Sequence, residues 1–300
     1  MTDTLPADEG LPLHVEQLWT YPIKSCAGIR LPSAVLFDTG LEWDRTWMVV
    51  DEDGEFLSQR ERPRMALVHP RFHLGQLELR APGMLPLHVA LDLRGTPCRV
   101  RVWDDEVNAW DMGDAAALWF TEFLMPELGA AVARLRLVRF DDAQRRLSSP
   151  RWTAGIEAPN RFSDGFPVLV LSSASLADLN ARLQALGQAP VGIERFRPNV
   201  VLGGLEPHDE DRLGAIWLSP PGAQVQLQPV KPCARCSIPD VDPATAEVQT
   251  RVSDTLRGYR QDRRLMGAVT FGMNAIVRHG AGAWLHEGTQ GKGAWNSWDD

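Results

Sequence analysis

Lys231-Pro-Cys-Ala-Arg-Cys236 is the stretch from which we infer the fold and the chemistry of this chain. It holds two of the four cysteines and one of the three lysines in 300 residues. A second short segment, Tyr21-Pro-Ile-Lys-Ser-Cys26, holds another lysine and another cysteine. Thiolate is a soft metal ligand, and an ammonium group binds anions. The two segments therefore predict a site for an anionic cofactor whose metal is bound by a thiolate.

The composition indicates an ordinary globular protein. With 44% hydrophobic residues, 300 residues can bury a large core, as two domains or as one with an insertion. The polar start, residues 1–10, lacks the pattern of an export signal, and no apolar run reaches the roughly 18 residues of a membrane span. We therefore expect a cytoplasmic protein with reduced thiols and no membrane contact. A net charge of −8 argues against nonspecific nucleic-acid binding.

Short β-rich runs dominate the pattern, so we expect an α+β, β-rich fold with few helices. Helices are expected from Asp114 to a stop at Pro126, after Ser172-Ser173 to a stop at Gly187, and near residues 253–259. Residues 141–166 lack periodicity and mark a domain junction. The expected division is a domain of residues 1–140, a domain of residues 141–288, and a loose tail over residues 289–300 that includes Trp295 and Trp298.

The Cys-x-x-Cys pair has several interpretations on its residues alone. Lys231 and Arg235 are cations that favour a thiolate at Cys233 or Cys236. A thioredoxin-like redox pair would open a helix, whereas prolines follow closely here. A structural zinc site would need two more ligands, from Cys26, Cys98 or a histidine. A plain buried cysteine is the usual alternative for either residue.

Further residues have the chemistry of an anion site. Lys24-Ser25 offers an ammonium, a hydroxyl and turn N–H groups, and Arg45 could close the same pocket, although a surface ion pair with Asp44 is the commoner role. Pro198 should hold Arg197 extended, with its guanidinium directed away from the local backbone. Ser172-Ser173, where a strand meets a helix, could bind an anion or simply cap the helix.

As a set, these segments resemble the MOSC family, the molybdenum cofactor sulfurase C-terminal domain, with its N-terminal β-barrel companion. Within it, the similarity is greatest to the amidoxime-reducing components and related bacterial reductases. The resemblance runs in order along nearly the whole chain, through residues 21–26, 44–47, 57–60, 171–172, 196–199, 232–236, 241–243 and 256–260. It implies a MOSC β-barrel domain preceded by a β-barrel-like domain.

The resemblance also implies the roles of individual residues. In the family the second cysteine of the pair binds molybdenum, which makes Cys236 the implied metal ligand and catalytic centre. The molybdopterin would then lie between the domains. Its phosphate and pterin would be held by Lys24, Ser25, Arg45, Arg197 and Asn199, with Ser172, Ser173 and Arg235 lining the same cleft. Asp240, close to Cys236 in sequence, is a candidate proton donor.

The implied activity is the reduction of N-hydroxylated small molecules such as amidoximes and hydroxylamines. Only four cysteines are present, so no iron–sulfur cluster is expected in the chain. Electrons would come from a separate ferredoxin-, flavoprotein- or cytochrome-type protein. The alternative is a non-catalytic module that carries the cofactor or transfers sulfur as a persulfide on Cys233 or Cys236.

Overall fold

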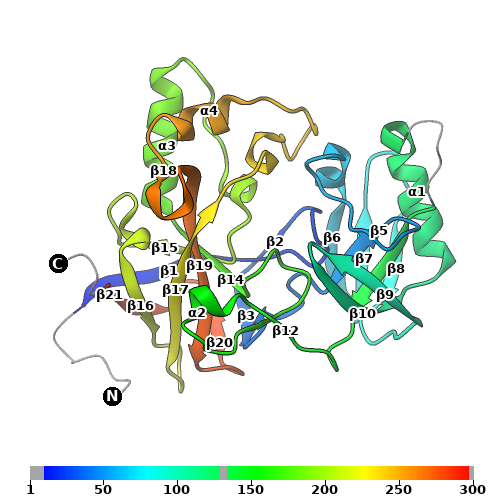
Figure 1. The fold of residues 1–300 in the computed structure, drawn as a ribbon, viewed down its shortest axis with the longest axis horizontal. Helices are drawn as coiled ribbons and strands as arrows, with labels where there is room; N and C mark the ends of the chain where they lie inside the picture. Colours follow the sequence, from blue (N-terminus) through cyan, green and yellow to red (C-terminus); the bar gives the residue numbers. More distant parts are fainter. Residues whose placement is uncertain (1–9, 129–133, 297–300) are drawn as a thin grey trace.

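The computed structural model describes residues 10–128 and 134–296, which form two lobes (Figure 1). One lobe is built around a barrel, and the other contains two small sheets and the longest helix. Strands outnumber helices in both lobes, so the expected β-rich fold is confirmed. None of the helices in the described part of the chain is long and apolar enough to cross a bilayer.

Seven strands of the described residues close into a barrel. Neighbours are antiparallel except for one parallel pair, β14 and β15, and pairing of β14 with β19 closes the ring. Apolar side chains from these strands fill the interior as one buried cluster. In ring order the strands are β14 (Val168–Ser172), β15 (Val200–Gly203), β1 (Leu11–Thr20), β21 (Gln290–Trp295), β16 (Leu213–Leu218), β17 (Val225–Ala234) and β19 (Ala268–His279).

The barrel takes strands from both ends of the sequence. β1 lies between β15 and β21, so residues 11–20 belong to the barrel although they precede the other lobe in sequence. The expected division at residue 140 therefore does not separate the two lobes completely. β21 also corrects the expected loose tail, because residues 290–295 pair with both β1 and β16. Residues 297–300, with Trp298, lie outside the described part.

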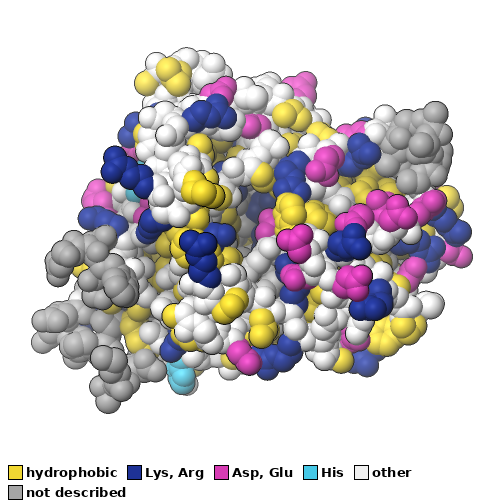
Figure 2. Space-filling model, viewed as in Figure 1, with side chains coloured by type: hydrophobic (Ala, Val, Ile, Leu, Met, Phe, Trp, Pro, Cys, Tyr) yellow, Lys and Arg dark blue, Asp and Glu magenta, His cyan; other side chains and the backbone are white. Residues whose placement is uncertain are grey.

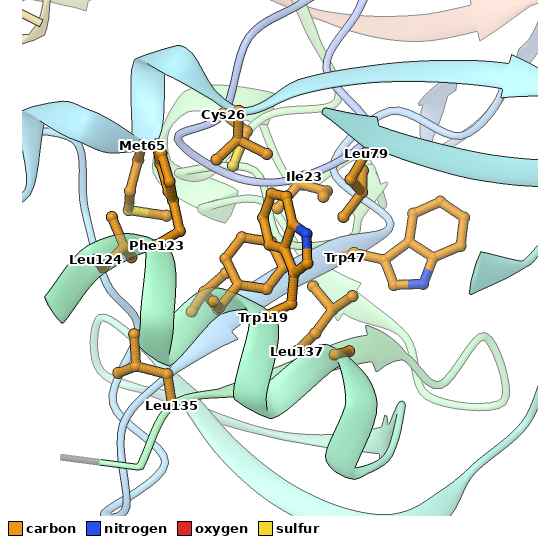
Figure 3. Packing of buried hydrophobic residues seen from close by; sticks show 14 of the residues in the cluster. Ile23, Cys26, Trp47, Met65, Leu79, Trp119, Phe123, Leu124, Leu135 and Leu137 are labelled. Carbon is orange, nitrogen blue, oxygen red and sulfur yellow. The ribbon is translucent and has the colours of Figure 1, made fainter. Parts of the chain in front are cut away.

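The other lobe, called the N-terminal lobe below, is formed mainly by residues 42–128 and 134–140. Helix α1 (Asp114–Leu128) packs Trp119 and Phe123 into a core that includes Leu137 (Figure 3). The helix runs past Pro126 to Leu128, so the expected stop at that proline is wrong. One sheet contains β5 (Trp47–Val50), β11 (Arg136–Phe140), β10 (Asp105–Asp111) and β9 (Thr96–Val102), and the other contains β6 (His69–His73), β7 (Gln76–Arg80) and β8 (Leu87–Ala90).

The remaining elements lie outside the barrel ring and the two small sheets. Helix α3 begins after its N-cap Ser172, and Gly187 follows its end with a positive φ, as expected. The α-helices here are α2 (Pro150–Thr153), α3 (Ser173–Ala185) and α4 (Arg251–Arg257). The strands are β2 (Ile29–Leu31), β3 (Ser33–Phe37), β4 (Gly40–Leu41), β12 (Arg146–Leu147), β13 (Pro159–Asn160), β18 (Gln261–Asp262) and β20 (Trp284–His286). The 3-10 helices are η1 (Pro63–Leu67), η2 (Ile193–Phe196), η3 (Asp209–Asp211), η4 (Ile238–Asp240) and η5 (Arg263–Leu265).

Closure of the barrel predicts the effect of substituting Gly272, which has a φ of +79° in β19. A Cβ there would lie 2.8 Å from the Val170 carbonyl oxygen of β14. Gly75→Ala is a matched control, since its φ is +73° but nothing lies within 4 Å of the added Cβ. We expect Gly272→Ala to lower the free energy of unfolding by about 1–3 kcal/mol more than the control does, as measured by urea unfolding. Equal losses would mean that only the backbone conformation matters.

Candidate cofactor site between the lobes

A cavity of about 690 Å³ is lined by both lobes and by the junction segment of residues 141–166. The space-filling view shows the hollow between the lobes (Figure 2). Seven cationic side chains line it against three carboxylates, although the whole chain carries a net charge of −8. The cations are Lys24, Arg45, Arg60, Arg146, Arg197, Lys231 and Arg235, and the acids are Asp104, Asp105 and Asp164. This excess of positive charge makes the cavity suited to an anion.

Lys24 and Ser25 reach the cavity because the residues on either side of them are anchored elsewhere. Ile23 and Cys26 are fully buried in the core of the N-terminal lobe (Figure 3). Ser25, between them, has a φ of +67°, which turns the chain sharply. The Lys24 ammonium donates to the Phe162 carbonyl at 2.9 Å.

Two opposing effects act on the pKa of Lys24. Burial lowers the pKa of this ammonium below its usual value, and the nearby Asp164 carboxylate opposes the shift. Lys24 also pairs with Asp164 directly. Lys24 therefore already has a negatively charged partner in the chain. An anion bound at this lysine would take the place of the Asp164 carboxylate.

Arg45 and Arg197 meet at Tyr21. The centres of their guanidinium groups lie 4.4 and 4.3 Å from the centroid of its ring. Arg45 is fixed by the Asp44 carboxylate at 2.7 Å and donates to the Arg197 carbonyl at 3.1 Å. Two like charges are thus held close together on one aromatic ring.

Arg197 is not extended as its neighbour Pro198 predicts. Its φ of +58° and ψ of +42° are left-handed, because its N–H closes the turn of η2 onto the Glu194 carbonyl and its own carbonyl accepts from Arg45. Burial and then the charge of Arg45 lower the pKa of Arg197 to about 10, so the guanidinium stays charged at neutral pH. Its Nη2 is buried without a hydrogen-bond partner among the described residues. An unpaired buried donor of this kind fits a bound anion.

Asn199 lines the cavity, but its side chain forms hydrogen bonds to other residues of the cavity wall. Its Oδ1 accepts from the Leu169 N–H at 3.0 Å and from Arg45 at 3.2 Å. Its Nδ2 donates to the Trp19 carbonyl at 3.2 Å. Asn199 therefore joins β1, β14 and Arg45, which sets the shape of the wall next to the cations.

Both cysteines of the pair open into the cavity. Cys233 is the penultimate residue of β17 and is partly buried, whereas Cys236 follows the strand and is exposed. Arg235 lies between them and donates to the Cys233 sulfur at 3.0 Å and to the Phe196 carbonyl at 2.8 Å. Its Nε is buried and has no partner in the described residues. The 3-10 helix η4 follows the pair, so this motif does not open an α-helix.

Comparison with known proteins decides the family. The MOSC N-terminal beta barrel domain model matches residues 13–127, and the MOSC domain model matches residues 157–288. Mitochondrial amidoxime reducing component 2 of Bos taurus is 34% identical over 257 residues, covering 82% of this chain and 72% of that protein. The chain belongs to the MOSC family. The resemblance inferred from its motifs is confirmed.

Two further relatives show the range of the MOSC family. Mitochondrial amidoxime-reducing component 1 of Homo sapiens is 33% identical over 269 residues, which are 84% of this chain and 75% of that protein. The molybdenum cofactor sulfurase of Drosophila grimshawi is 31% identical over 248 residues, which are 80% of this chain but only 29% of that protein. These names point to chemistry of the molybdenum cofactor.

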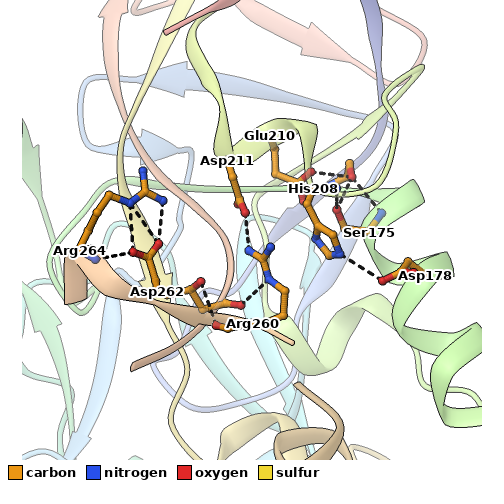
Figure 4. Close-up of polar contacts among 10 residues, drawn as sticks. Ser175, Asp178, His208, Glu210, Asp211, Arg260, Asp262 and Arg264 are labelled. Carbon is orange, nitrogen blue, oxygen red and sulfur yellow. Dashed lines mark hydrogen bonds and ion pairs between the residues drawn. The ribbon is translucent and has the colours of Figure 1, made fainter. Parts of the chain in front are cut away.

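Ser172 and Ser173 do not line the cavity. Ser172 caps α3, and its hydroxyl donates to the buried Glu210 carboxylate at 2.8 Å. Ser173 donates to Glu16 at 2.5 Å. Figure 4 shows Glu210 beside Ser175 in this polar network. The capping alternative therefore describes Ser172, Ser173 is engaged by Glu16, and neither serine belongs to the proposed cofactor site.

Asp240 also lies outside the main cavity. It lines a smaller cavity of about 230 Å³ that shares Arg235 and Cys236 with the larger one. Its side chain is 2% exposed, and its Oδ1 accepts from the Ser253 N–H at 2.9 Å, in the first turn of α4. These contacts give Asp240 a structural role in the MOSC domain, and we do not carry it forward as the proton donor.

The structure adds residues that sequence reasoning missed. Arg146 is 7% exposed and joins the lobes by an ion pair with Asp105 at 2.7 Å. It also donates to the Ser163 carbonyl at 2.7 Å, which orders the junction segment. Trp103 and Arg60 complete the wall on the side of the N-terminal lobe. The sequence could have pointed to Trp103, because a tryptophan is unusual in a two-residue turn between strands.

The different environments of the cysteines predict their order of alkylation. Burial raises the pKa of Cys26 to about 12 and that of Cys98 to about 11, which leaves little thiolate at pH 8. We expect iodoacetamide at pH 8 to label Cys236 of the metal-free protein at least roughly tenfold faster than Cys26, measured by peptide mass spectrometry. In urea all four cysteines should react at similar rates. Equal rates in the native protein would contradict an exposed Cys236.

Proposed function

We propose that this MOSC protein binds a molybdenum cofactor in the cavity and reduces N-hydroxylated compounds. The observation that carries the proposal is one exposed thiol, Cys236, in the wall of a cavity that is otherwise rich in cations. No group of three or more His, Cys, Asp or Glu side chains able to hold a metal occurs among residues 10–128 and 134–296. A metal in the cavity would then have Cys236 as its protein ligand and take its other ligands from the cofactor.

The residues present fit an anionic cofactor. Lys24, Ser25, Arg45 and Arg197 would hold its phosphate, because they offer charge, a hydroxyl and the unpaired Nη2 of Arg197. Arg235 would hold the pterin end through its unpaired Nε, next to the metal ligand. Asn199 would position Arg45 and would not need to touch the cofactor.

The bound metal would supply the two-electron redox chemistry. The overall reaction is the conversion of an N–OH group, two electrons and two protons into an N–H group and water. The protein holds the cofactor, orients the substrate in the remaining cavity and keeps Cys236 accessible from it. Electrons would come from a separate redox protein, and the substrate would be a small molecule. A cytoplasmic location stays a prediction.

The second candidate function is a carrier or sulfur-transfer module. The observation that favours it is the contact of Arg235 with the Cys233 sulfur at 3.0 Å, since a cation beside a thiol supports sulfur chemistry. A carrier would hold the cofactor but would not turn over an N-hydroxylated substrate. Turnover of an amidoxime with a chemical electron donor therefore separates the two functions.

Metal content tests the role of Cys236. We expect protein from a host that makes the cofactor to contain molybdenum, and Cys236→Ser to retain less than about a tenth of it, because the ligand is lost. Cys98→Ser is the matched control, since Cys98 lies outside the cavity, and it should retain wild-type content. The measurement is elemental analysis by mass spectrometry. Zinc in place of molybdenum in the wild type would overturn the proposal.

Pterin content tests whether Arg197 binds the cofactor. We expect Arg197→Gln to lose about tenfold or more in cofactor affinity, because a charge-assisted bond to an anion is lost. Arg30→Gln makes the same change of charge at an exposed ion pair with Glu287 and should bind normally. The measurement is pterin released on denaturation, detected by fluorescence. Equal content in both variants would remove Arg197 from the site.

A further inference from the structure

Trp103 is an unusual residue for the position it occupies. β9 ends at Val102 and β10 begins at Asp105, and these two residues pair directly. Trp103 and Asp104 therefore form a two-residue hairpin turn, in which the first position has a positive φ and is normally Gly or Asn. The φ of Trp103 is +56°, which is a strained conformation for a bulky side chain.

The strained turn places the indole in the wall of the cavity. Trp103 is 41% exposed and lines the cavity from the side of the N-terminal lobe. Phe56 packs edge-on against it with ring centroids 5.0 Å apart, and the Arg60 guanidinium lies 4.7 Å from its centroid. The indole Nε1 donates to Asp164 at 3.3 Å. The ring is thus fixed by its neighbours while much of it stays open to a ligand.

The charges around the indole argue for the substrate over the cofactor. All three carboxylates of the cavity are at this wall, since Asp104 and Asp105 follow Trp103 in the turn and Asp164 accepts its Nε1–H. Three cations offset these acids, since Arg60 lies over the ring, Arg146 pairs with Asp105 and Lys24 pairs with Asp164. This wall is therefore close to neutral. An anionic cofactor is favoured instead at Tyr21, where Arg45 and Arg197 face a single carboxylate, Asp44. A flat molecule without negative charge can stack on the indole.

We propose that Trp103 is a specificity-determining residue that binds flat, conjugated N-hydroxylated substrates, such as aromatic amidoximes, in preference to aliphatic ones. The proposal rests on the proposed function for the N-hydroxylated class. The stacking itself is a property of Trp103 and can be measured by binding, without turnover. A failure of substrate stacking on Trp103 can therefore be distinguished from a failure of the proposed reductase function.

The test uses Trp103→Gly in the full chain, because glycine adopts a positive φ without strain. Its thermal unfolding midpoint should be no lower than that of the wild type. Isothermal titration with benzamidoxime should show a dissociation constant roughly three- to tenfold higher, the loss of one aromatic contact. Trp103→Phe should recover part of the affinity. Trp284→Ala, at an exposed tryptophan in β20 outside the cavity, is the control and should bind like the wild type.

Kinetics provide the second readout. In Trp103→Gly the ratio of kcat/KM for benzamidoxime to that for acetamidoxime should fall, mainly through KM for the aromatic compound. Unchanged benzamidoxime binding in Trp103→Gly, or no binding by the wild type, would overturn the proposal. Loss of pterin from this variant but not from Trp284→Ala would also overturn it, since the indole would then hold the cofactor. Normal benzamidoxime binding without turnover by the wild type would instead refute the reductase function.

Discussion

The contact of two guanidinium groups with one tyrosine ring is the constraint on which the site depends. Arg45 comes from the connection between β4 and β5, and Arg197 comes from the turn before β15. Like charges a few ångströms apart repel by roughly a few kcal/mol near a protein surface. Asp44 and the Tyr21 ring offset part of this repulsion. A bound anion would offset the rest, so the same arrangement that destabilises the empty site favours occupancy.

Backbone strain accompanies this arrangement. Ser25, Arg45 and Arg197 line the cavity with φ values of +67°, +45° and +58°. Each such residue costs of order 1–3 kcal/mol and persists only where its surroundings enforce it. Here the buried neighbours of Ser25 and the hydrogen bonds of Arg45 enforce it. The donors are therefore already in place before a ligand arrives, which reduces the entropy lost on binding.

The motifs allowed much of the site to be predicted, because Lys24, Arg45, Arg197 and Cys236 carry chemistry that is scarce or charged. Local rules failed where distant contacts decide the outcome. Arg197 adopts a left-handed conformation because of Glu194 and Arg45, and not the extended one that Pro198 favours. Residues 290–295 contain two glycines and little apolar character, so only the gap between β1 and β16 makes them a strand. Arg146 gave no local signal, since its partners lie on a hairpin and a loop that sequence alone does not bring together.

The pairing of β1 with β21 has a consequence for biosynthesis. β1 and one of its ring neighbours, β21, are separated by almost 280 residues, so the ring cannot close before β21 has been synthesised. The N-terminal lobe, whose contacts are closer in sequence, can fold earlier. A cavity that needs both walls would then form only after synthesis of residue 295. Loading of any prosthetic group would accordingly follow the synthesis of β21, and the edge of β1 that pairs with β21 would be exposed to chaperones or to aggregation until then.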